Sequence, residues 1–425
     1  MKQLKRIISK LAPQGAKNVA HVAEAWLSVA LFGFPAKGMT IAGVTGTDGK
    51  TTTANFLANM LEAGGKRVAL ASTVSFKVAG SVRVNASKYT TLGGYHLQKF
   101  LHDAKKVGCT HVVLEASSHA LDQGRLSGVR FAVAVITNVT REHLDYHKTM
   151  EEYRLAKRRL FDHADAAVVN LDMWEPEFFL RRAKRKSTYS TIESSADLLA
   201  ENLTLSLDGS KFSIGETDFE LRLPGKFNVE NVLAAAGAAS LLGIPMDVIA
   251  RAASELVLVP GRMESVKNGL GATIIIDYAV TPDALGKLYE LVSSMRTVGT
   301  KIVSVFGACG DRDRGKRPIM GEIVSSNADI IILTDEDPYF ENPERILDEI
   351  QEGIRNKEIG ESLFRIRDRR TAIRKGLSLL SPGDIMLVTG KGAEEVMLVG
   401  DERIPWNDKK VIVEELESLS EISRS

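Results

Sequence analysis

The stretch Thr45-Gly46-Thr47-Asp48-Gly49-Lys50-Thr51-Thr52-Thr53 decides the fold of this chain. An apolar run, residues 39–44, precedes it, and a helical pattern, residues 54–62, follows it. Glycines between a strand and a helix let backbone N–H groups turn toward phosphate oxygens, and the helix start adds its positive dipole end. Lys50 can then reach terminal phosphates, and Thr51 can offer its hydroxyl to Mg²⁺. The pattern predicts an ATP site, although its glycine spacing is shorter than in a strict Walker A loop.

Composition narrows the class of protein. The chain has 425 residues, 44% of them hydrophobic, which suggests two or three globular domains. Its formal net charge of +1 gives no electrostatic reason to expect nucleic-acid binding. Two cysteines, Cys109 and Cys309, cannot form a disulfide framework, and we expect a protein of the reducing cytoplasm.

The beginning of the chain combines basic and apolar residues. An apolar stretch, residues 19–34, follows five basic residues: Lys2, Lys5, Arg6, Lys10 and Lys17. A signal peptide has this order, but His21 and Glu24 interrupt the run, and it is too short to span a bilayer. We expect a helix that packs on the first domain. The alternative is a helix on the inner membrane face, with its lysines on anionic lipid.

Short apolar runs alternate with helical patterns in the rest of the chain, which predicts parallel sheets covered on both faces. Residues 187–223 instead alternate polar and apolar, with a turn at Asp208-Gly209, and predict a small antiparallel insertion. Val259-Pro260-Gly261 marks a boundary. The expected strands are 67–71, 111–115, 133–137, 166–170, 273–277, 302–306, 330–334 and 385–389, with helices at 228–242 and 371–380.

We therefore expect an α/β protein with three parts. Residues 1–38 form a helical stub, and residues 39–259 form a P-loop ATPase domain with a parallel sheet and the antiparallel insertion. Residues 260–425 form a second, Rossmann-like α/β domain.

Polar loops follow several of these strands. Glu115 ends a strand beside the phosphate loop, where a carboxylate can hold Mg²⁺. His143 lies in a polar segment after another strand, whereas Lys157 looks like an ordinary surface lysine and would not be selected from the residues alone. Two further glycine loops, residues 307–317 and 390–394, also follow strands. Such loops predict a cleft between two α/β domains.

In this order the motifs resemble the Mur ligase family, most closely its MurE type, which adds the third amino acid of the peptidoglycan stem peptide. The likeness runs from about residue 39 to the C-terminal helix and includes the segments 115–125, 138–147, 223–231, 259–264 and 310–317. It implies that ATP phosphorylates a carboxylate of a muramoyl-peptide acceptor and that the amine of an amino acid attacks the acyl phosphate. We expect a cytoplasmic monomer.

The resemblance also implies roles for single residues. Lys50, Glu115, His143 and Lys157 would be catalytic, and Thr51, Glu115, His143 and a carbamylated Lys157 would serve Mg²⁺. The nucleotide would be held by Gly46, Thr47, Asp48, Gly49, Lys50, Thr51, Thr52, Asn231, Arg262 and Asp277. The acceptor would be held by Thr90, Thr91, Ser117, Gln123 and Arg125.

The incoming amino acid is predicted from charge. Relatives that select meso-diaminopimelate carry Asp-Asn-Pro-Arg where this chain reads Glu336-Asp337-Pro338-Tyr339. Tyr339 cannot make the bidentate pair of a guanidinium with the distal carboxylate. Glu336 and Asp337 add negative charge, and Glu394 could hold an amine. We expect lysine or ornithine rather than diaminopimelate.

Only about 40 residues precede the phosphate loop, so we expect the site that binds the UDP part of the acceptor to be missing, altered or supplied by a partner.

Two alternatives to a MurE-type ligase stay open. Folylpolyglutamate-type synthases share the core and lack a UDP domain, but the run 117–125 favours the MurE type. A non-catalytic nucleotide-binding scaffold is the other alternative, and the four catalytic candidates argue against it.

Overall fold

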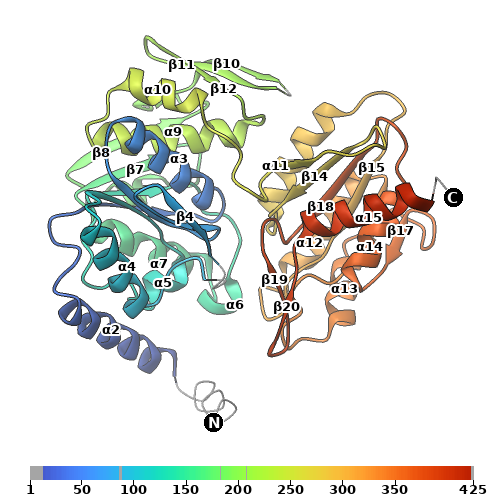
Figure 1. The fold of residues 1–425 in the computed structure, drawn as a ribbon, viewed down its shortest axis with the longest axis horizontal. Coiled ribbons are helices and arrows are strands. Elements are labelled where there is room, and N and C mark those ends of the chain that lie inside the picture. The colour runs from blue at the N-terminus through green and yellow to red at the C-terminus, as the bar shows by residue number, and fades with distance from the viewer. Residues whose placement is uncertain (1–12, 86–88, 182, 207, 423–425) are drawn as a thin grey trace. The chain divides into compact units, whose positions relative to one another are not determined.

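A computed structural model describes residues 13–85, 89–181, 183–206 and 208–422 (Figure 1). The chain forms two compact units. The first contains the residues up to Val139 and Glu151–Val257, and the second contains Thr140–Met150 and the residues from Leu258 onward. The domain bounds expected from the sequence stay a prediction, and Lys2, Lys5, Arg6 and Lys10 lie outside the described residues.

A nine-stranded sheet organises the first unit, in the order β4-β3-β2-β5-β1-β6-β7-β8-β9. Its strands are parallel except for β3 and β4, which pair antiparallel at one edge. The bounds are β1 Thr40–Thr45, β2 Val68–Ala71, β3 Ser75–Val78, β4 Ser81–Val84, β5 His111–Glu115, β6 Val133–Ile136, β7 Ala166–Asn170, β8 Arg185–Ser190 and β9 Leu198–Leu199. The central β1 lies between β5 and β6, so three loops leave the sheet side by side at the carboxyl ends of these strands.

Helices cover both faces of this sheet (Figure 1). On one face α3 (Lys50–Ala63) packs on α9 (Lys226–Leu241), a helix whose buried run of alanines permits close approach. On the other face, α4 (Gly94–Lys106) and α7 (Met150–Asp162) add leucine and phenylalanine side chains to the core. Among the described residues, the remaining helices of this unit are α2 Gln14–Leu31, α5 Ser118–Asp122, α8 Glu177–Leu180 and α10 Met246–Ser254.

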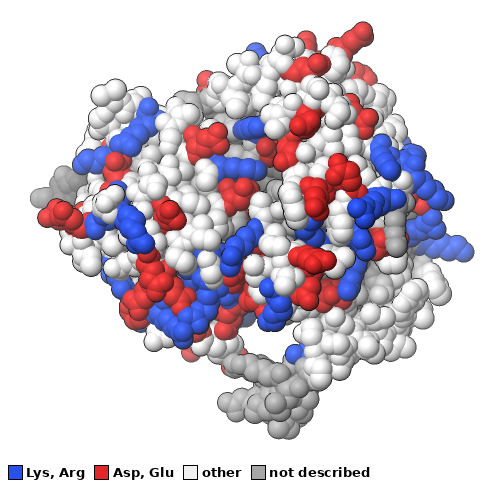
Figure 2. All heavy atoms as spheres, turned by 180° about the vertical axis from the view of Figure 1, so that it is seen from behind, with Lys and Arg blue, Asp and Glu red and all other residues white. Residues whose placement is uncertain are grey.

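The helix α2 gives the first unit a distinctive surface. It packs on α4 through Ala25, Ser28 and Val29, as expected for a helix docked on this unit. The view from behind shows a broad area without charged side chains at lower right (Figure 2). None of the residues that the structure describes belongs to a helix long and apolar enough to cross a membrane.

The antiparallel insertion is present but shorter than predicted. It consists of β10 (Glu201–Ser206), β11 (Gly209–Ile214) and β12 (Thr217–Leu221), with Phe212 and Phe219 stacked at 5.1 Å. The prediction that it begins at residue 187 is wrong, because β8 pairs in parallel with β7 instead. Tyr189 in β8 is buried and donates its hydroxyl to the carbonyl of Ile136, which ties this strand to the large sheet.

The second unit contains a six-stranded sheet in the order β13-β14-β18-β15-β16-β17. The short β13 (Glu264–Val266) is antiparallel, and the other strands are parallel: β14 Thr273–Asp277, β15 Ile302–Phe306, β16 Ile330–Leu333, β17 Leu363–Arg365 and β18 Ile385–Thr389. Helices α14 (Arg369–Ser378) and α15 (Asp408–Ile422) cover one face, and α11 (Pro282–Met295), α12 (Lys316–Asn327) and α13 (Pro343–Gln351) cover the other (Figure 1). A hairpin, β19 (Val396–Val399) with β20 (Glu402–Pro405), and the short α6 (Leu144–His147) complete the unit.

Candidate functional site

The phosphate loop joins β1 to α3 and needs glycine at two positions. Gly46 has φ +150°, and a Cβ there would lie 1.8 Å from the hydroxyl of Thr137. Gly49 has φ +79°, and its Cβ would lie 2.3 Å from the side-chain oxygen of Asn231. Both backbone shape and close packing therefore exclude a side chain at these points.

Neighbouring strands hold the loop in place. The side-chain oxygen of Asn138, which follows β6, accepts the N–H groups of Thr47 at 3.2 Å and Asp48 at 2.9 Å. The Lys50 ammonium folds back onto the carbonyl of Thr47 at 2.7 Å. Thr52 is buried in the first turn of α3. The loop is thus preformed, with Lys50 at its rim.

Glu115 lies at the centre of a cluster of oxygen atoms. Its carboxylate is 2% exposed and accepts the Thr51 hydroxyl at 3.0 and 3.1 Å. Thr73 donates its backbone N–H at 2.8 Å and its hydroxyl at 3.0 Å to the same carboxylate. A hydroxyl and a carboxylate beside a phosphate loop form the oxygen donor set that Mg²⁺ prefers. These residues fit the expected magnesium site.

Lys157 is a buried amine and not a surface lysine. It projects from α7, is 1% exposed, and donates to the carbonyl of Gly46. Its ammonium lies 4.3 Å from the centre of the Tyr153 ring, and the Tyr153 hydroxyl is 3.1 Å from that of Thr47. The structure therefore brings Lys157 to the back of the phosphate loop, 107 positions after Lys50 in the sequence.

The residues expected to hold the acceptor gather near the carboxyl end of β5. Thr91 donates its hydroxyl to the carbonyl of Glu115 at 2.9 Å and accepts the N–H of Ser117 at 2.9 Å. The Thr90 hydroxyl lies 3.1 Å from the Thr73 hydroxyl. These three side chains, which come from two loops, share their surroundings with the Glu115 cluster. Gln123 ends α5, and the Arg125 guanidinium lies 5.8 Å from the Tyr89 ring.

Asn231 is placed by α9 against the start of α3. It accepts the Thr53 hydroxyl at 3.1 Å and touches the backbone at Gly49. The structure thus places this expected nucleotide residue directly against the phosphate loop.

His143 lies on a segment that belongs to the second unit, whereas Thr51, Glu115 and Lys157 lie in the first. Two ion pairs hold the segment. Glu142 accepts the Lys316 ammonium at 3.0 Å, and Arg141 lies 3.2 Å from Asp313. Burial would lower the pKa of Lys316, but the Glu142 carboxylate outweighs it, so the pKa is raised and the pair stays charged.

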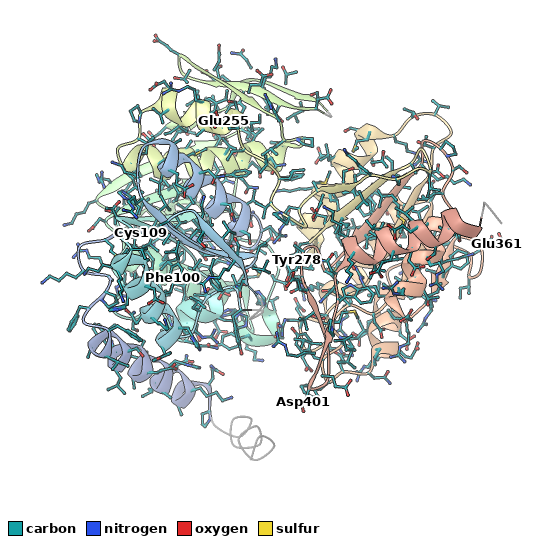
Figure 3. The ribbon with its side chains drawn as sticks, viewed as in Figure 1. Phe100, Cys109, Glu255, Tyr278, Glu361 and Asp401 are labelled. Atoms are coloured by element: carbon teal, nitrogen blue, oxygen red, sulfur yellow. The ribbon has the colours of Figure 1, made fainter. Side chains whose placement is uncertain are left out.

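Loops at the carboxyl ends of β14, β15, β16 and β18 form the corresponding edge of the second unit. Asp277 accepts the N–H of Met263 at 2.8 Å, and the Arg262 guanidinium lies 4.4 Å from the ring of Tyr278, which follows β14 (Figure 3). Arg262 and Asp277 therefore lie close together on two adjacent segments, and their role in holding the nucleotide stays a prediction.

The Lys391 ammonium joins the two loops expected to receive the amino acid. Lys391 is fully buried and donates to Asp337 at 2.7 Å, to Glu394 at 2.6 Å and to the carbonyl of Val396 at 2.9 Å. Burial works to lower its pKa, but the two carboxylates together raise it. One ammonium is thus shared by two carboxylates and offsets one of their two negative charges.

Glu336 and Tyr339 have separate partners. The Cys309 thiol donates to Glu336 at 2.9 Å, and burial raises the pKa of both groups. The Arg312 guanidinium lies 5.1 Å from the Tyr339 ring. Both carboxylates thus have partners inside the protein, because Asp337 binds Lys391 and burial raises the pKa of Glu336. The preference for lysine or ornithine stays a prediction.

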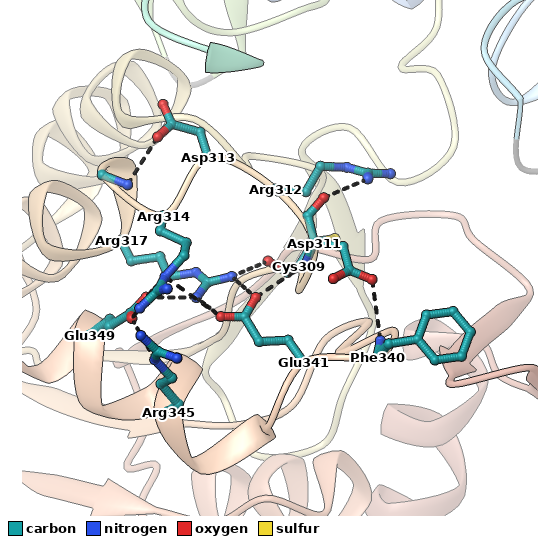
Figure 4. A network of polar contacts seen from close by, with 11 residues as sticks. Cys309, Asp311, Arg312, Asp313, Arg314, Arg317, Phe340, Glu341, Arg345 and Glu349 are labelled. Atoms are coloured by element: carbon teal, nitrogen blue, oxygen red, sulfur yellow. Dashed lines mark hydrogen bonds and ion pairs between the residues drawn. The ribbon is translucent and has the colours of Figure 1, made fainter. Parts of the chain in front are cut away.

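A network that the sequence analysis missed braces these loops (Figure 4). Arg317 is fully buried and donates to Glu341 at 2.8 and 2.7 Å and to Glu349 at 2.7 Å. Glu341 also accepts the N–H of Asp311 at 3.1 Å, and the N–H of Phe340 donates to the Asp311 carboxylate at 3.3 Å. The only signal in the sequence was the alternation of charge in residues 310–317.

Within the described ranges, no three His, Cys, Asp or Glu side chains are grouped so that they could hold a metal ion. Thr51 and Glu115 supply one hydroxyl and one carboxylate, which are oxygen ligands of the kind that Mg²⁺ accepts.

Comparison with known protein families decides the assignment. The Mur ligase middle domain matches residues 44–239, and the Mur ligase, glutamate ligase domain matches residues 261–392. A UDP-N-acetylmuramyl-tripeptide synthetase of Roseiflexus sp. (strain RS-1) is 41% identical over 413 residues, which are 92% of this chain and 81% of the relative. The chain belongs to the Mur ligase family. Members of this family are ATP-dependent ligases, so the resemblance seen in the sequence motifs is confirmed.

Solved structures agree with this assignment. A UDP-N-acetylmuramoyl-L-alanyl-D-glutamate–2,6-diaminopimelate ligase is 34% identical with a TM-score of 0.60, covering 91% of this chain and 80% of its own. A folylpolyglutamate synthase of Mycobacterium tuberculosis has a TM-score of 0.73 at 15% identity, covering 91% of this chain and 95% of its own. The second likeness shows the fold alone. The predicted α/β fold is confirmed.

Proposed function

We propose that this Mur ligase uses ATP and Mg²⁺ to add one amino acid to UDP-N-acetylmuramoyl-L-Ala-D-Glu or a closely similar muramoyl peptide. The observation that carries the proposal is the arrangement around Glu115, where the phosphate loop, Thr51 and the expected acceptor residues Thr91 and Ser117 share one cluster. A phosphoryl group and an acceptor carboxylate can meet only where both binding sites adjoin.

The phosphate loop and its cations prepare the first step. Thr51 and Glu115 would hold Mg²⁺, which neutralises phosphate charge when it is bound. Lys50 turns from the Thr47 carbonyl to the terminal phosphates. A carboxylate oxygen of the acceptor then attacks the γ-phosphorus of ATP, the bond to the β-phosphate oxygen breaks, and ADP leaves.

The second step forms the amide. The amine of the incoming amino acid attacks the carbonyl carbon of the acyl phosphate, the carbon–oxygen bond to phosphate breaks, and the nitrogen loses its proton. Thr90, Thr91, Ser117, Gln123 and Arg125 orient the acceptor. Lys157 reacts with CO₂ to carry a carbamate, which changes the charge behind the phosphate loop from positive to negative.

The incoming amino acid is received by the loops of the second unit that carry Asp337, Tyr339 and Glu394. Lys391 binds both carboxylates of these loops and offsets one of their two charges, so the charge left for a cationic side chain is smaller than the sequence alone implies. Arg312 beside Tyr339 supplies a cation at the position where the diaminopimelate-specific motif carries arginine. We therefore place lysine, ornithine and diaminopimelate on equal terms in the test.

A ligation screen read by mass spectrometry tests the function. The full chain, ATP, Mg²⁺ and UDP-N-acetylmuramoyl-L-Ala-D-Glu are incubated with each amino acid in turn. We expect one product that is heavier by a single residue, and equimolar ADP. A parallel reaction with tetrahydrofolate and glutamate tests the folylpolyglutamate alternative, and product there alone would refute the proposal.

Two glutamate variants separate catalysis from fold. Glu115→Gln removes the carboxylate charge beside Thr51 and should lower the ligation rate at least 100-fold. Glu255→Gln changes an exposed glutamate at the end of α10 and should leave the rate unchanged. ADP release that needs neither acceptor nor amino acid would contradict the ligase and favour the scaffold alternative.

A further inference from the structure

The helix α2 is apolar on two opposite sides. Its inner side is packed, because Ala25, Ser28 and Val29 are buried. The Ala25 backbone is so close to Gly94 that a Cβ added to Gly94 would lie 2.8 Å from the Ala25 Cα. Val22 and Val29 fill the space above Gly124 and Gly128. A helix already docked on this side would normally turn a polar face to solvent.

The outer side of α2 is apolar instead. Val19 is 70% exposed, Trp26 53%, Leu27 73% and Leu31 70%. These positions are spaced by seven, one and four residues and lie on one face of a helix. Four alanines on the same face are also exposed: Ala16, Ala20, Ala23 and Ala30. Figure 2 shows this uncharged area at lower right.

Charge is distributed unevenly around this apolar face. The first 23 residues contain five Lys or Arg and no Asp or Glu. Glu24, at the margin of the face, has His21 3.8 Å away. Beyond the other end of α2, Lys37 and Lys105 are exposed, and the Lys105 ammonium donates to the Lys37 carbonyl. Among the described residues, Lys17 lies in the first turns of α2, and Lys37 and Lys105 lie beyond its other end.

We propose that the outer face of α2 binds the surface of an anionic lipid bilayer, with Trp26, Leu27 and Leu31 inserted among the acyl chains and the lysines on the headgroups. An apolar helix face flanked by Lys and Arg, with a tryptophan at the polar–apolar boundary, has the composition of interfacial helices. Each basic residue near such a surface adds electrostatic attraction. The proposal is independent of the ligase function.

A second copy of the chain fits this face less well. A stable dimer buries about 800 Å² on each partner. An 18-residue helix is about 27 Å long and about 10 Å wide, so one face supplies only about 300 Å². Pairing two copies through α2 would also bring together two N-terminal segments that each carry five cations and no acid. A bilayer requires neither a large area nor an opposing cation.

Vesicle flotation tests the proposal with the full chain. Vesicles of phosphatidylcholine with 30% phosphatidylglycerol are compared with phosphatidylcholine alone, at 50 and 500 mM salt. We expect at least tenfold stronger partition onto the anionic vesicles at low salt, and a clear loss at high salt. Tryptophan emission should shift to shorter wavelength on binding, and Trp26→Phe should remove the shift but keep the binding.

Paired variants identify the surface. Leu27→Ser with Leu31→Ser replaces two exposed side chains and should lower partition at least tenfold without changing thermal stability. Ile192→Ser alters a residue that is 68% exposed elsewhere on this unit and should have no effect.

Three results would overturn the proposal. The first is equal or absent partition on both vesicle types. The second is loss of partition in Ile192→Ser that matches the Leu27 and Leu31 variant. The third is a lipid-free dimer that the same variant converts to monomer, since this would assign the face to a second copy.

Discussion

Replacing Lys391 by methionine tests whether its buried charge stabilises the two loops that carry Asp337 and Glu394. Methionine keeps the length of the side chain and removes its charge. Lys391 is fully buried, and its ammonium binds Asp337 and Glu394, of which Asp337 is itself only 2% exposed. Removing one partner of a buried ion pair leaves an uncompensated charge and costs about 3–5 kcal/mol. We expect the second unit to lose that much of its free energy of unfolding at neutral pH.

The effect should depend on pH with a defined sign. In the wild-type protein the pKa of Lys391 is raised, so its contribution is fully present below the unfolded lysine pKa of about 10.4 and constant between pH 5 and 8. In the variant, burial without a counter-ion raises the folded pKa of Asp337 above its unfolded value of about 3.9. The folded variant then binds more protons than the unfolded chain, so its stability falls as pH rises. The deficit relative to wild type should shrink on going from pH 8 to pH 5.

Urea unfolding followed by tryptophan fluorescence measures this deficit. In a Trp26→Phe, Trp174→Phe background only Trp406 remains of the three tryptophans, and it reports on the second unit. The control is Lys409→Met, which breaks an ion pair with Glu264 whose lysine is 53% exposed and should cost at most about 1 kcal/mol. Equal losses in both variants, or a Lys391→Met deficit that is the same at pH 5 and pH 8, would refute the reasoning.

Three predictions concern the phosphate loop. Lys157→Ala should lose ligation and regain part of it with added formate or acetate, which replace the carbamate charge; full activity without a supplement would remove Lys157 from the mechanism. Gly49→Ala should weaken ATP binding, measured by calorimetry, at least tenfold, because the new Cβ would lie 2.3 Å from the Asn231 side-chain oxygen. The control is Gly80→Ala, which has a similar φ of +86° and no atom within 4 Å of the new Cβ, and it should leave ATP affinity unchanged. Thr51→Val should lower ATP affinity at least tenfold with Mg²⁺ present and little without it, and an equal loss in both conditions would contradict the metal role.

The buried strands could be predicted from the sequence almost residue by residue. The expected strands 111–115, 166–170, 273–277, 302–306 and 385–389 coincide with β5, β7, β14, β15 and β18. Each is a short apolar run covered on both faces and bounded by polar residues, so local composition suffices. The sequence analysis did not predict the hairpin of β3 and β4. In the structure, Ala79 and Gly80 both have positive φ and form the turn that joins these two short strands.

The order of pairing was harder to predict. Residues 185–190 alternate like an antiparallel strand, yet they extend the parallel sheet beside β7. Alternation reports that one face of a strand is polar, and it does not report which strand lies next to it. The buried hydroxyl of Tyr189, bonded to the carbonyl of Ile136, shows that distant partners decided this pairing.

The same contrast between local sequence pattern and distant partners explains which residues of the candidate site could be predicted. Residues such as Thr51 and Glu115 follow directly from a strand, a glycine loop and a helix start, because their chemistry depends on positions close to an element boundary. Lys157 looked like an ordinary surface lysine, and the sequence did not mark Lys391 or Arg317 as buried, yet all three are at most 1% exposed.

A buried cation needs partners that the fold brings from elsewhere in the chain. Asp337 reaches Lys391 from 54 residues away, and the Gly46 carbonyl reaches Lys157 from 111 residues away. Local sequence specifies where a charge stands on an element, but only the packed structure specifies whether water or another charge balances it. For this reason the argument from charge about the incoming amino acid missed the buried partner of Asp337 and Glu394, while the argument from spacing predicted the strand, glycine loop and helix start of the phosphate loop.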